Sequence, residues 1–314
     1  MIVRDRPSGL RMFLLIRGSV LQQIRTVLLV NILLATLVTI THGGAAFSHK
    51  ITLTAIPFTL IGLPLAIFLG FRNTAAYDRY WEARKLWGEL LLRCRNLSRQ
   101  CQSLIDLPAP VQPAAGLDDV RTRMVYRAMA FCHALRQQLR DVPDHGEVQA
   151  LLQPTEWQAL AGKHSKTEVL MQHMGADLQQ CLRARQIDGP LAANIDNTLS
   201  AMVAAAASCE RIKHSPLPFS YTLLLHRTAY MYCFLLPFGL VDTIGFMTPF
   251  VVGIVAYTFF GLDALGDEIE EPFGMSPNDL PLDAICRTVE INLRESLGET
   301  DLPAPLQPKD YCLL

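Results

Sequence analysis

The densest group of side chains that could do chemistry lies in residues 263–271. Five carboxylates fall within these nine residues, at Asp263, Asp267, Glu268, Glu270 and Glu271. Carboxylate oxygens in such a run can bind a hard cation such as Ca²⁺, but the run lacks the glycine-turned loop of an EF-hand. Runs of like charge are more often solvated or paired with basic side chains. We therefore favour a salt-bridged or solvated helix end, and the sequence predicts no bound metal and no other cofactor.

The histidines offer weaker metal-site candidates. His164 and His173 are nine residues apart, which suits no standard pair of metal ligands, so we interpret them as surface residues. His42 and His49 could form a ring of ligands in an oligomer, which is a minor alternative. The common nucleotide-binding, hydrolase and metalloprotease motifs are absent. The sequence therefore predicts no catalytic residues and no enzymatic activity.

One charged residue, Arg227, lies inside a long apolar stretch beside His226. An arginine at the centre of a bilayer costs about 2.5–3.5 kcal/mol on insertion scales, so it should face protein or water rather than lipid. A functional role and a structural ion pair both fit this position. A lower start of the helix would instead place Arg227 near the cytosolic interface. We retain Arg227 as a candidate buried intramembrane charge.

The most informative apolar segment reads IPFTLIGLPLAIFLGF. Within it Leu63, Ile67 and Phe71 recur every four residues and so share one face of a helix, while Pro57 and Pro64 interrupt the helical hydrogen bonds. The simpler interpretation is that this face contacts lipid or packs against a neighbouring helix. The functional interpretation is a stack of apolar rings from several subunits, which constricts a pore and gates it by dewetting.

Long apolar helices must position these residues, and the composition agrees with that. Half of the residues are hydrophobic and 18% are charged, while the mean hydropathy is +0.23. A bilayer-spanning helix needs about 20 mostly apolar residues. Four stretches approach or exceed that length, at residues 26–41, 51–71, 216–240 and 243–262. The sequence therefore predicts an all-α, polytopic membrane protein with four transmembrane helices per subunit.

The basic residues indicate how these spans are oriented. Arginines precede the first span, and four basic residues follow the second, at Arg72, Arg79, Arg84 and Lys85. The loop between the first two spans carries only Lys50, and the turn between the last two carries no Lys or Arg. Under the positive-inside rule, both termini should be cytosolic. No block of basic residues indicates nucleic-acid binding.

Residues 72–215 and 263–314 form the remaining part of the chain, which we expect to be a cytosolic helical bundle without strands. A buried stripe is predicted from the helical spacing of Leu86, Leu90, Cys94, Leu97 and Cys101. The eight cysteines are scattered, so disulfides are not expected. Proline, glycine and polar clusters separate the helical patterns, which cover residues 73–105, 118–139, 155–186, 191–212 and 282–297.

With these residues assembled, the chain resembles the bestrophin family, and specifically its bacterial branch. The resemblance is carried by IRGSVLQQIR, LAIFLGFRNTAAYDRYWEARKLWGEL, PLPFSYTLLLHRTAYMYCFLLPFGL and EEPFGMSPNDLPLD, in residues 16–25, 65–90, 216–240 and 270–283. These segments occur in the expected order across nearly the whole chain. Residues 107–182 carry less of the resemblance.

The resemblance implies that residues 1–314 form one subunit of a homopentameric channel in a bacterial inner membrane. Its central pore would have a hydrophobic neck formed by Leu63, Ile67 and Phe71. The family also has a second, cytosolic constriction after a short turn. Here the turn is Asp188-Gly189-Pro190, which points to Leu191, with Ile187 as the alternative.

The chain departs from the family pattern after Pro272-Phe273-Gly274. Animal members continue with a dense acidic stretch that helps to bind calcium, whereas this chain continues with Met275-Ser276-Pro277-Asn278-Asp279. We therefore expect no calcium activation. The bacterial branch implies monovalent cations as the permeant ions, and an anion channel is the alternative. A membrane sensor or scaffold is the alternative from another class. The expected partners are other copies of the chain, membrane lipid and monovalent ions.

Overall fold

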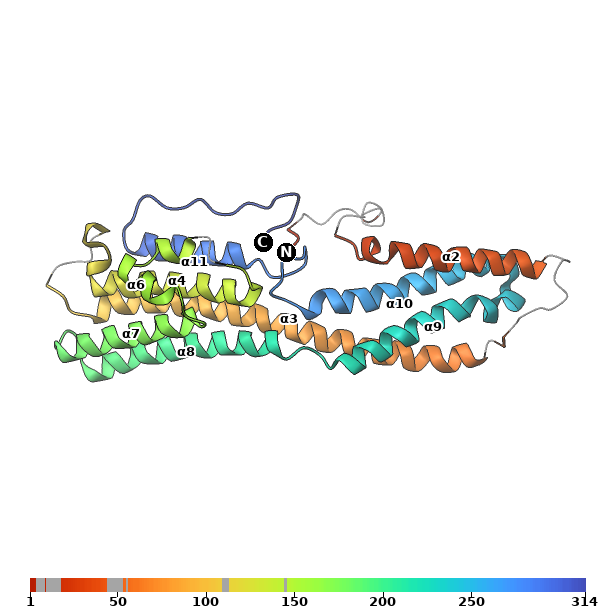
Figure 1. The fold of residues 1–314 in the computed structure, drawn as a ribbon, viewed down its shortest axis with the longest axis horizontal. Coiled ribbons are helices and arrows are strands. Elements are labelled where there is room, and N and C mark those ends of the chain that lie inside the picture. The colour runs from red at the N-terminus through yellow and green to blue at the C-terminus, as the bar shows by residue number, and fades with distance from the viewer. Residues whose placement is uncertain (4–8, 10–17, 44–52, 55, 109–112, 144–145) are drawn as a thin grey trace. The chain divides into compact units, whose positions relative to one another are not determined.

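The computed structural model describes residues 1–3, 9, 18–43, 53–54, 56–108, 113–143 and 146–314. Their secondary structure is almost entirely α-helical (Figure 1), and their β pairing is limited to isolated bridges of Cys312 with Ile2 and Lys309. This confirms the prediction of an all-α protein. The arginines at 4, 6, 11 and 17, as well as His49 and Lys50, lie outside the described residues.

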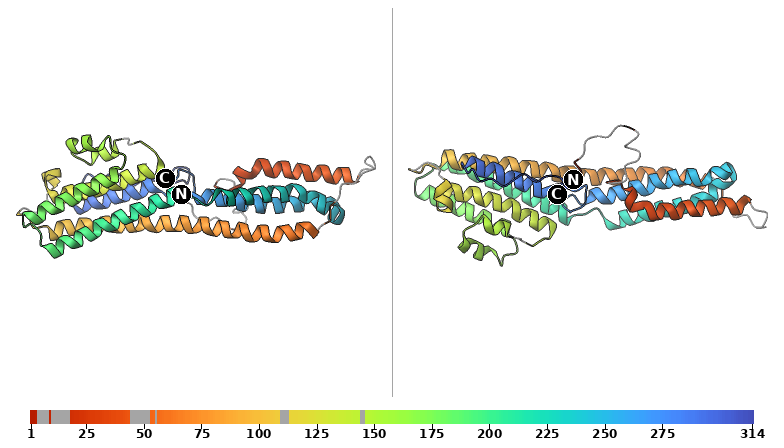
Figure 2. Two further views of the ribbon diagram at one scale, coloured as in Figure 1. Left: turned by 60° about the horizontal axis from the view of Figure 1, so that its bottom comes forward. Right: turned by 90° about the horizontal axis from the view of Figure 1, so that it is seen from above.

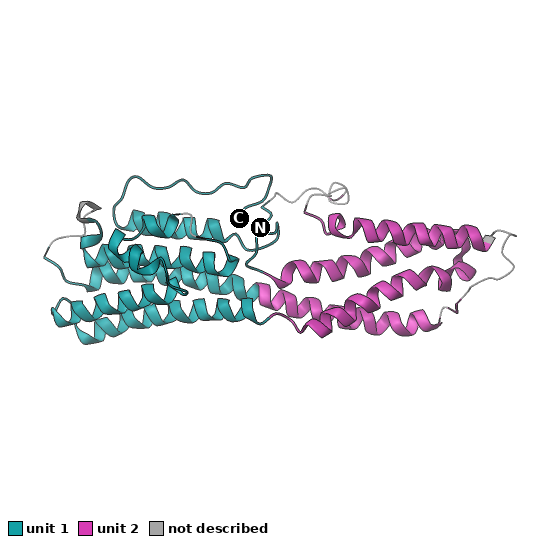
Figure 3. Cartoon of the chain, viewed as in Figure 1, with its two compact units in different colours: residues 1–3, 81–215, 272–314 teal, residues 4–80, 216–271 magenta. Residues whose placement is uncertain are grey.

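The chain divides into two compact units (Figure 3). Unit 1 comprises residues 1–3, 81–215 and 272–314, and unit 2 comprises residues 4–80 and 216–271. The sequence placed the corresponding boundaries at residues 72 and 263. One helix, α3 (Ile56–Leu104), contributes residues to both units.

Unit 2 contains the long apolar helices. They are α2 (Leu21–Gly43), the first part of α3, α9 (Phe219–Ile244) and α10 (Thr248–Glu270). By length and composition, residues 21–42, 56–104 and 219–270 could each cross a membrane, and the last stretch contains both α9 and α10. Each predicted span thus falls largely on one long helix. The number of helices that cross the membrane stays a prediction.

The connection between α9 and α10 is short because its residues stop one helix and start the next. Gly245 has φ = 51°, a conformation that favours glycine, and it follows the last residue of α9. The 3₁₀ turn η2 (Gly245–Met247) then leads into α10, where Pro249 lies in the first turn and loses no helical hydrogen bond. Helices α9 and α10 pack against each other and against α2.

Helix α3 corrects two sequence expectations. Residues 56–71 of the predicted span and residues 73–104 of the predicted helix belong to one uninterrupted helix of 49 residues. It begins at Ile56, so Pro57 lies in the first turn and interrupts no helical hydrogen bond. Pro64 does lie inside the helix, and there it removes one backbone donor without ending the helix.

Unit 1 is a bundle around α4 (Val120–Arg140), which is buried along most of its length. Helix α4 packs against α7 (Lys166–Arg183), α8 (Gly189–His214) and α11 (Leu282–Ser296) (Figure 2). Shorter elements complete the unit: η1 (Pro113–Asp118), α5 (Glu147–Ala150) and α6 (Pro154–Leu160). The prediction of a single helix over residues 155–186 is wrong. Helix α6 ends at Leu160, and α7 begins after Ser165, whose side chain accepts a hydrogen bond from the Glu168 N–H.

The predicted stripe of α3 is buried in unit 1. Leu90, Cys94, Leu97 and Cys101 are at most 1% exposed, and Leu86 is half-buried. All eight cysteines are free, as expected. The ends of the chain also meet in unit 1, where the Leu313 N–H donates to the Met1 carbonyl at 2.9 Å.

Candidate functional site

One side of α3 in unit 2 packs firmly against α9. Leu65 is 3% exposed and forms a cluster with Leu225 and Ala229 of α9. Gly62 permits this close approach, because a Cβ there would lie 2.9 Å from the hydroxyl oxygen of Tyr232. These contacts fix which side of α3 faces inward.

The opposite side of α3 is left uncovered by the chain itself. Leu63, Ile67 and Phe71 are 67%, 47% and 62% exposed. Exposure of large apolar side chains to water at successive helical turns is unfavourable. We therefore expect this face to contact lipid, another protein surface or the same face of other subunits around a pore. The structure therefore brings together the three residues predicted to form the neck, on the side of α3 that the subunit does not use for its own packing.

A buried arginine lies directly after this face. Arg72 is 0% exposed and follows Phe71 in α3. Its Nη1 donates to Asp263 Oδ1 at 2.9 Å, and its Nη2 contacts Asp267 and lies 3.5 Å from Glu270 Oε2. All three carboxylates belong to α10. The pairing ties α3 to α10 beside the last of the apolar residues.

Asp263 also connects a third helix to this cluster. Its Oδ2 lies 2.6 Å from Nδ1 of His226 in α9. The Glu270 carboxylate accepts a hydrogen bond from the Leu217 N–H at 3.1 Å, at the start of α9. We call Arg72, His226, Asp263, Asp267 and Glu270 the arginine cluster. The arginine cluster joins α3, α9 and α10 within unit 2. Its carboxylates supply the negative charge that the buried Arg72 guanidinium requires.

The cluster explains most of the acidic run at 263–271. The interpretation of this run as a salt-bridged helix end is confirmed for Asp263, Asp267 and Glu270. Within the described part of the chain, no three His, Cys, Asp or Glu side chains are grouped so as to hold a metal ion. Each of these three carboxylates has one oxygen paired with Arg72.

Sequence reasoning counted Arg72 only as one of the basic residues flanking a span. The available signal was its position next to an apolar face, together with an acidic run that needed cations. Its partner Asp263 is 191 residues away in sequence, so only the fold could identify the pair.

Arg227, the candidate buried intramembrane charge, has its surroundings only partly defined by the single subunit. It lies on an exposed part of α9, so the single chain does not bury it. Its neighbour His226 is the residue that faces the other helices. Burial of Arg227 by another subunit stays a prediction.

The two candidates for the cytosolic constriction differ in burial within unit 1. Ile187 is 5% exposed and packs in the interior, whereas Leu191 in the first turn of α8 is half-exposed. Pro190 lies in the first turn of that helix, where it loses no helical hydrogen bond. Of the two residues, Leu191 is therefore the one whose side chain is accessible at the surface of the subunit.

The histidines named from the sequence have ordinary partners or surfaces. His42 Nε2 lies 3.0 Å from Asp242 Oδ1 in unit 2, which gives it a carboxylate partner in place of a metal ring. His173 Nδ1 lies 2.7 Å from Glu156 Oε1, and His164 is exposed.

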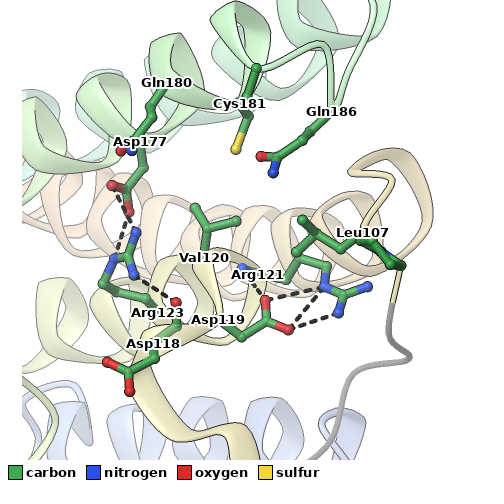
Figure 4. Close-up of a pocket in the computed structure, with 12 residues that line it drawn as sticks. Leu107, Asp118, Asp119, Val120, Arg121, Arg123, Asp177, Gln180, Cys181 and Gln186 are labelled. Atoms are coloured by element: carbon green, nitrogen blue, oxygen red, sulfur yellow. Dashed lines mark hydrogen bonds and ion pairs between the residues drawn. The ribbon is translucent and has the colours of Figure 1, made fainter.

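Unit 1 contains a cavity of about 550 Å³ (Figure 4) whose two arginines are paired with carboxylates. Arg123 donates to both carboxylate oxygens of Asp177, at 2.9 and 3.1 Å. Arg121 donates to Asp119, with Nη2 and Oδ2 2.7 Å apart. Burial raises the pKa of Asp119, but the hydrogen bonds from Arg121 outweigh it and hold this pKa below its usual range.

The long apolar helices and the uncovered apolar face are typical of a helical membrane protein. The family model described as bacterial/fungal bestrophin protein matches residues 1–295. The chain belongs to this bestrophin family. It is a bacterial membrane protein of a channel family and not an enzyme.

The relatives cover nearly the whole chain. The voltage-dependent anion channel-forming protein mll4386 of Mesorhizobium japonicum is 42% identical over 95% of this chain and 93% of its own length. The voltage-dependent anion channel-forming protein YneE of Escherichia coli K12 is 39% identical over 98% of both chains. A crystal structure of a mutant bestrophin homologue from Klebsiella pneumoniae matches with a TM-score of 0.81 at 37% identity. That match covers 88% of this chain and all of the other.

Proposed function

We propose that the chain is the subunit of a homopentameric channel that conducts monovalent ions passively through a central pore. The observation that carries this proposal is the uncovered apolar face of α3, formed by Leu63, Ile67 and Phe71. Arg72 and Leu65 hold the other side of the helix. Around a symmetry axis, five copies of the uncovered face form the neck.

The neck works as a hydrophobic gate. Successive rings are four residues apart, which is roughly 6 Å along the helix axis. A narrow apolar tube of this kind can empty of water, and an ion in it loses hydration that no side chain replaces. Opening then requires only a small widening, because wetting restores the passage. Leu191 forms the second, cytosolic constriction, since Ile187 is used in the core of unit 1.

Two candidates exist for the sign of the permeant ion. The bacterial branch implied monovalent cations, but the names of the relatives favour the anion alternative. Leu63, Ile67 and Phe71 carry no charge, so the neck itself does not select by sign. A reversal-potential measurement across a potassium chloride gradient decides between them, because the two selectivities give potentials of opposite sign.

The arginine cluster supports a channel that calcium does not activate. Asp263, Asp267 and Glu270 are paired with Arg72, and Pro272-Phe273-Gly274 is not followed by a dense acidic stretch. Chelation of calcium should therefore leave the conductance unchanged. Strong activation by micromolar calcium would contradict this part of the proposal.

We further propose that the channel lies in a bacterial inner membrane with both termini in the cytosol. The basic residues after residue 71, such as Arg79 and Lys85, support this orientation. The meeting of the two chain ends in unit 1 supports their location on the same side of the membrane.

Purified protein in planar lipid bilayers tests the proposal. Discrete single-channel currents are the expected result, and light scattering in detergent should give the mass of a pentamer. A stable monomer or dimer would overturn the central-pore arrangement, because one subunit has too few helices to enclose a pore. Assembled protein without currents would favour the sensor or scaffold alternative.

A further inference from the structure

A second cavity in unit 1 lies between α4 and α11. Its volume is about 330 Å³, which is within the range of small-molecule sites. His133, Arg136 and Arg140 contribute to it from one face of α4, at helical spacing. Asp283 and Arg287 contribute from α11. The lining thus gathers three arginines and one histidine from two packed helices.

The cavity contains buried hydrogen-bond donors that find no acceptor among the described residues. His133 is 3% exposed, and neither ring nitrogen has a hydrogen-bond partner. The Nε atoms of Arg136 and Arg287 are also buried and unpartnered. His133 Nε2 lies 3.7 Å from Glu290 Oε2, which is beyond hydrogen-bond distance. Unsatisfied buried donors are rare, and each one costs stability unless a ligand or water accepts its hydrogen.

The lining of this cavity carries more arginines than carboxylates. Asp283 Oδ1 lies 3.1 Å from Arg136 Nη1 and 2.8 Å from Arg140 Nη1, so one carboxylate serves two arginines. Glu147 pairs with Arg136. The Nε of Arg287 lies 3.8 Å from Glu290 Oε2, which is beyond hydrogen-bond distance. Three lining arginines therefore face two lining carboxylates.

The cavity of Figure 4 gives the contrast. There Arg121 and Arg123 have hydrogen bonds to Asp119 and Asp177. Both cavities have arginines paired with carboxylates, but the cavity between α4 and α11 also keeps buried donors without an acceptor in the described part of the chain. The second pattern is typical of a site prepared for an acceptor from outside the chain.

We propose that the cavity between α4 and α11 binds the oxyanion group of a small cytosolic molecule, a phosphate or a carboxylate. Several acceptor oxygens on one group can receive the hydrogens of His133, Arg136 and Arg287 together. The negative charge complements the surplus arginine. Guanidinium groups bind such planar or tetrahedral oxyanions with charge-assisted hydrogen bonds.

The site also touches a segment that follows the long apolar helices in sequence. Met275 lines the cavity and lies five residues after Glu270, the last residue of α10. Met275 belongs to the segment 272–281, which leads from α10 to α11. A ligand in this cavity would therefore contact the segment that follows α10.

Calorimetric titration of the full-length protein in detergent tests this inference. Inorganic phosphate and succinate are titrated separately, with potassium chloride at matched ionic strength as the control titrant. Saturable heat with phosphate or with succinate, and none with chloride, is the expected result. The probe that binds more tightly identifies the oxyanion as phosphate or carboxylate. No saturable binding of either probe would overturn the proposal.

Variants assign the binding to this cavity. Arg287→Gln, at a partly exposed position, should weaken binding about tenfold or more, as expected for a lost hydrogen bond to a charged group. Arg183→Gln, in the last turn of α7 and outside the cavity, is the matched control and should bind as the parent protein does. His133→Gln is the second variant, accepted only if its thermal unfolding matches the parent. Equal affinity of the parent protein and Arg287→Gln would place the binding elsewhere and overturn the proposal.

Discussion

Helix α3 runs through both units, and its two parts leave very different surfaces uncovered. In residues 56–80 the uncovered side chains are large and apolar, with Leu60, Leu63 and Phe71 69%, 67% and 62% exposed. In residues 81–104 the exposed positions are mostly charged, such as Arg84, Lys85, Glu89, Arg95 and Arg99. The same helix is thus built for an apolar environment in its first part and for water in its second.

The buried sides of the two parts also differ in polarity, but in the reverse order. In residues 81–104 the inner side is an apolar stripe that includes Leu90, Cys94 and Leu97. In residues 56–80 the inner side carries Arg72, a charge fully enclosed by its carboxylate partners. In an apolar environment every face of a helix can be apolar, so specific contacts must fix its rotation. Leu65 and Gly62 provide such contacts with α9, and the ion pairs of Arg72 with α10 add to them.

The largest effect is expected from breaking the arginine cluster. Arg72→Met should destabilise unit 2 by about 3–5 kcal/mol, because it leaves buried carboxylates without a cation. Asp263→Asn should cost less, since Arg72 keeps Asp267 and Glu270. Thermal unfolding in detergent measures both.

A control and a double variant sharpen this test. Arg95→Met, at an exposed position of the same helix, should change stability little. The double variant Arg72→Met/Asp263→Asn should lose less than the sum of the single losses, because the two side chains interact directly. Additive losses would show that Arg72 and Asp263 do not act as a pair.

The second effect concerns the apolar stripe in residues 81–104. Leu90→Ala should lower the free energy of unfolding by about 2–5 kcal/mol, because a 1%-exposed side chain is removed from a packed core. Leu92→Ala, two residues along and 54% exposed, is the control and should cost under about 1 kcal/mol. Equal losses at the two positions would contradict the division of this part of α3 into an inner and an outer side.

The smallest effect is a pH dependence in unit 1. Because the folded-state pKa of Asp119 is depressed, its hydrogen bonds with Arg121 stabilise the fold above the unfolded-state pKa. This contribution should be lost as the pH falls through the lower, folded-state pKa. Asp119→Asn should therefore reduce the loss of stability on acidification, measured as the shift of the unfolding temperature between neutral and acidic pH. An unchanged acid dependence would exclude Asp119 as a contributor.

The sequence predicted the helices well where one periodic pattern persists. Leu90, Cys94 and Leu97 identified the inner side of α3 because a water-facing helix sorts its residues by polarity. The neck face was also predicted, but from spacing and family resemblance. In an apolar helix, spacing alone cannot say which face the subunit leaves uncovered. Only the packing of Leu65 and Gly62 against α9 did so.

Other features were missed for identifiable reasons. The restart at α7 had a local signal, since Ser165 and Glu168 have the spacing of a capping box, but the continuing helical pattern hid it. The burial of Arg72 had only an indirect signal in the acidic run, and its pairing with Asp263 could not be read locally because the two residues lie 191 positions apart. The unpartnered His133 likewise depends on how α4 and α11 meet.

Single-channel recording of the triple variant Leu63→Ala/Ile67→Ala/Phe71→Ala tests the central claim most directly. Smaller side chains widen the apolar tube and remove the dewetting barrier, so open probability or conductance should rise severalfold. Because no charge changes, ion selectivity should change much less. The measurement uses only protein that light scattering shows to be assembled as the parent is. A rise in open probability or conductance is the result that our account predicts. Unaltered currents from correctly assembled protein would show that this face of α3 is not the neck.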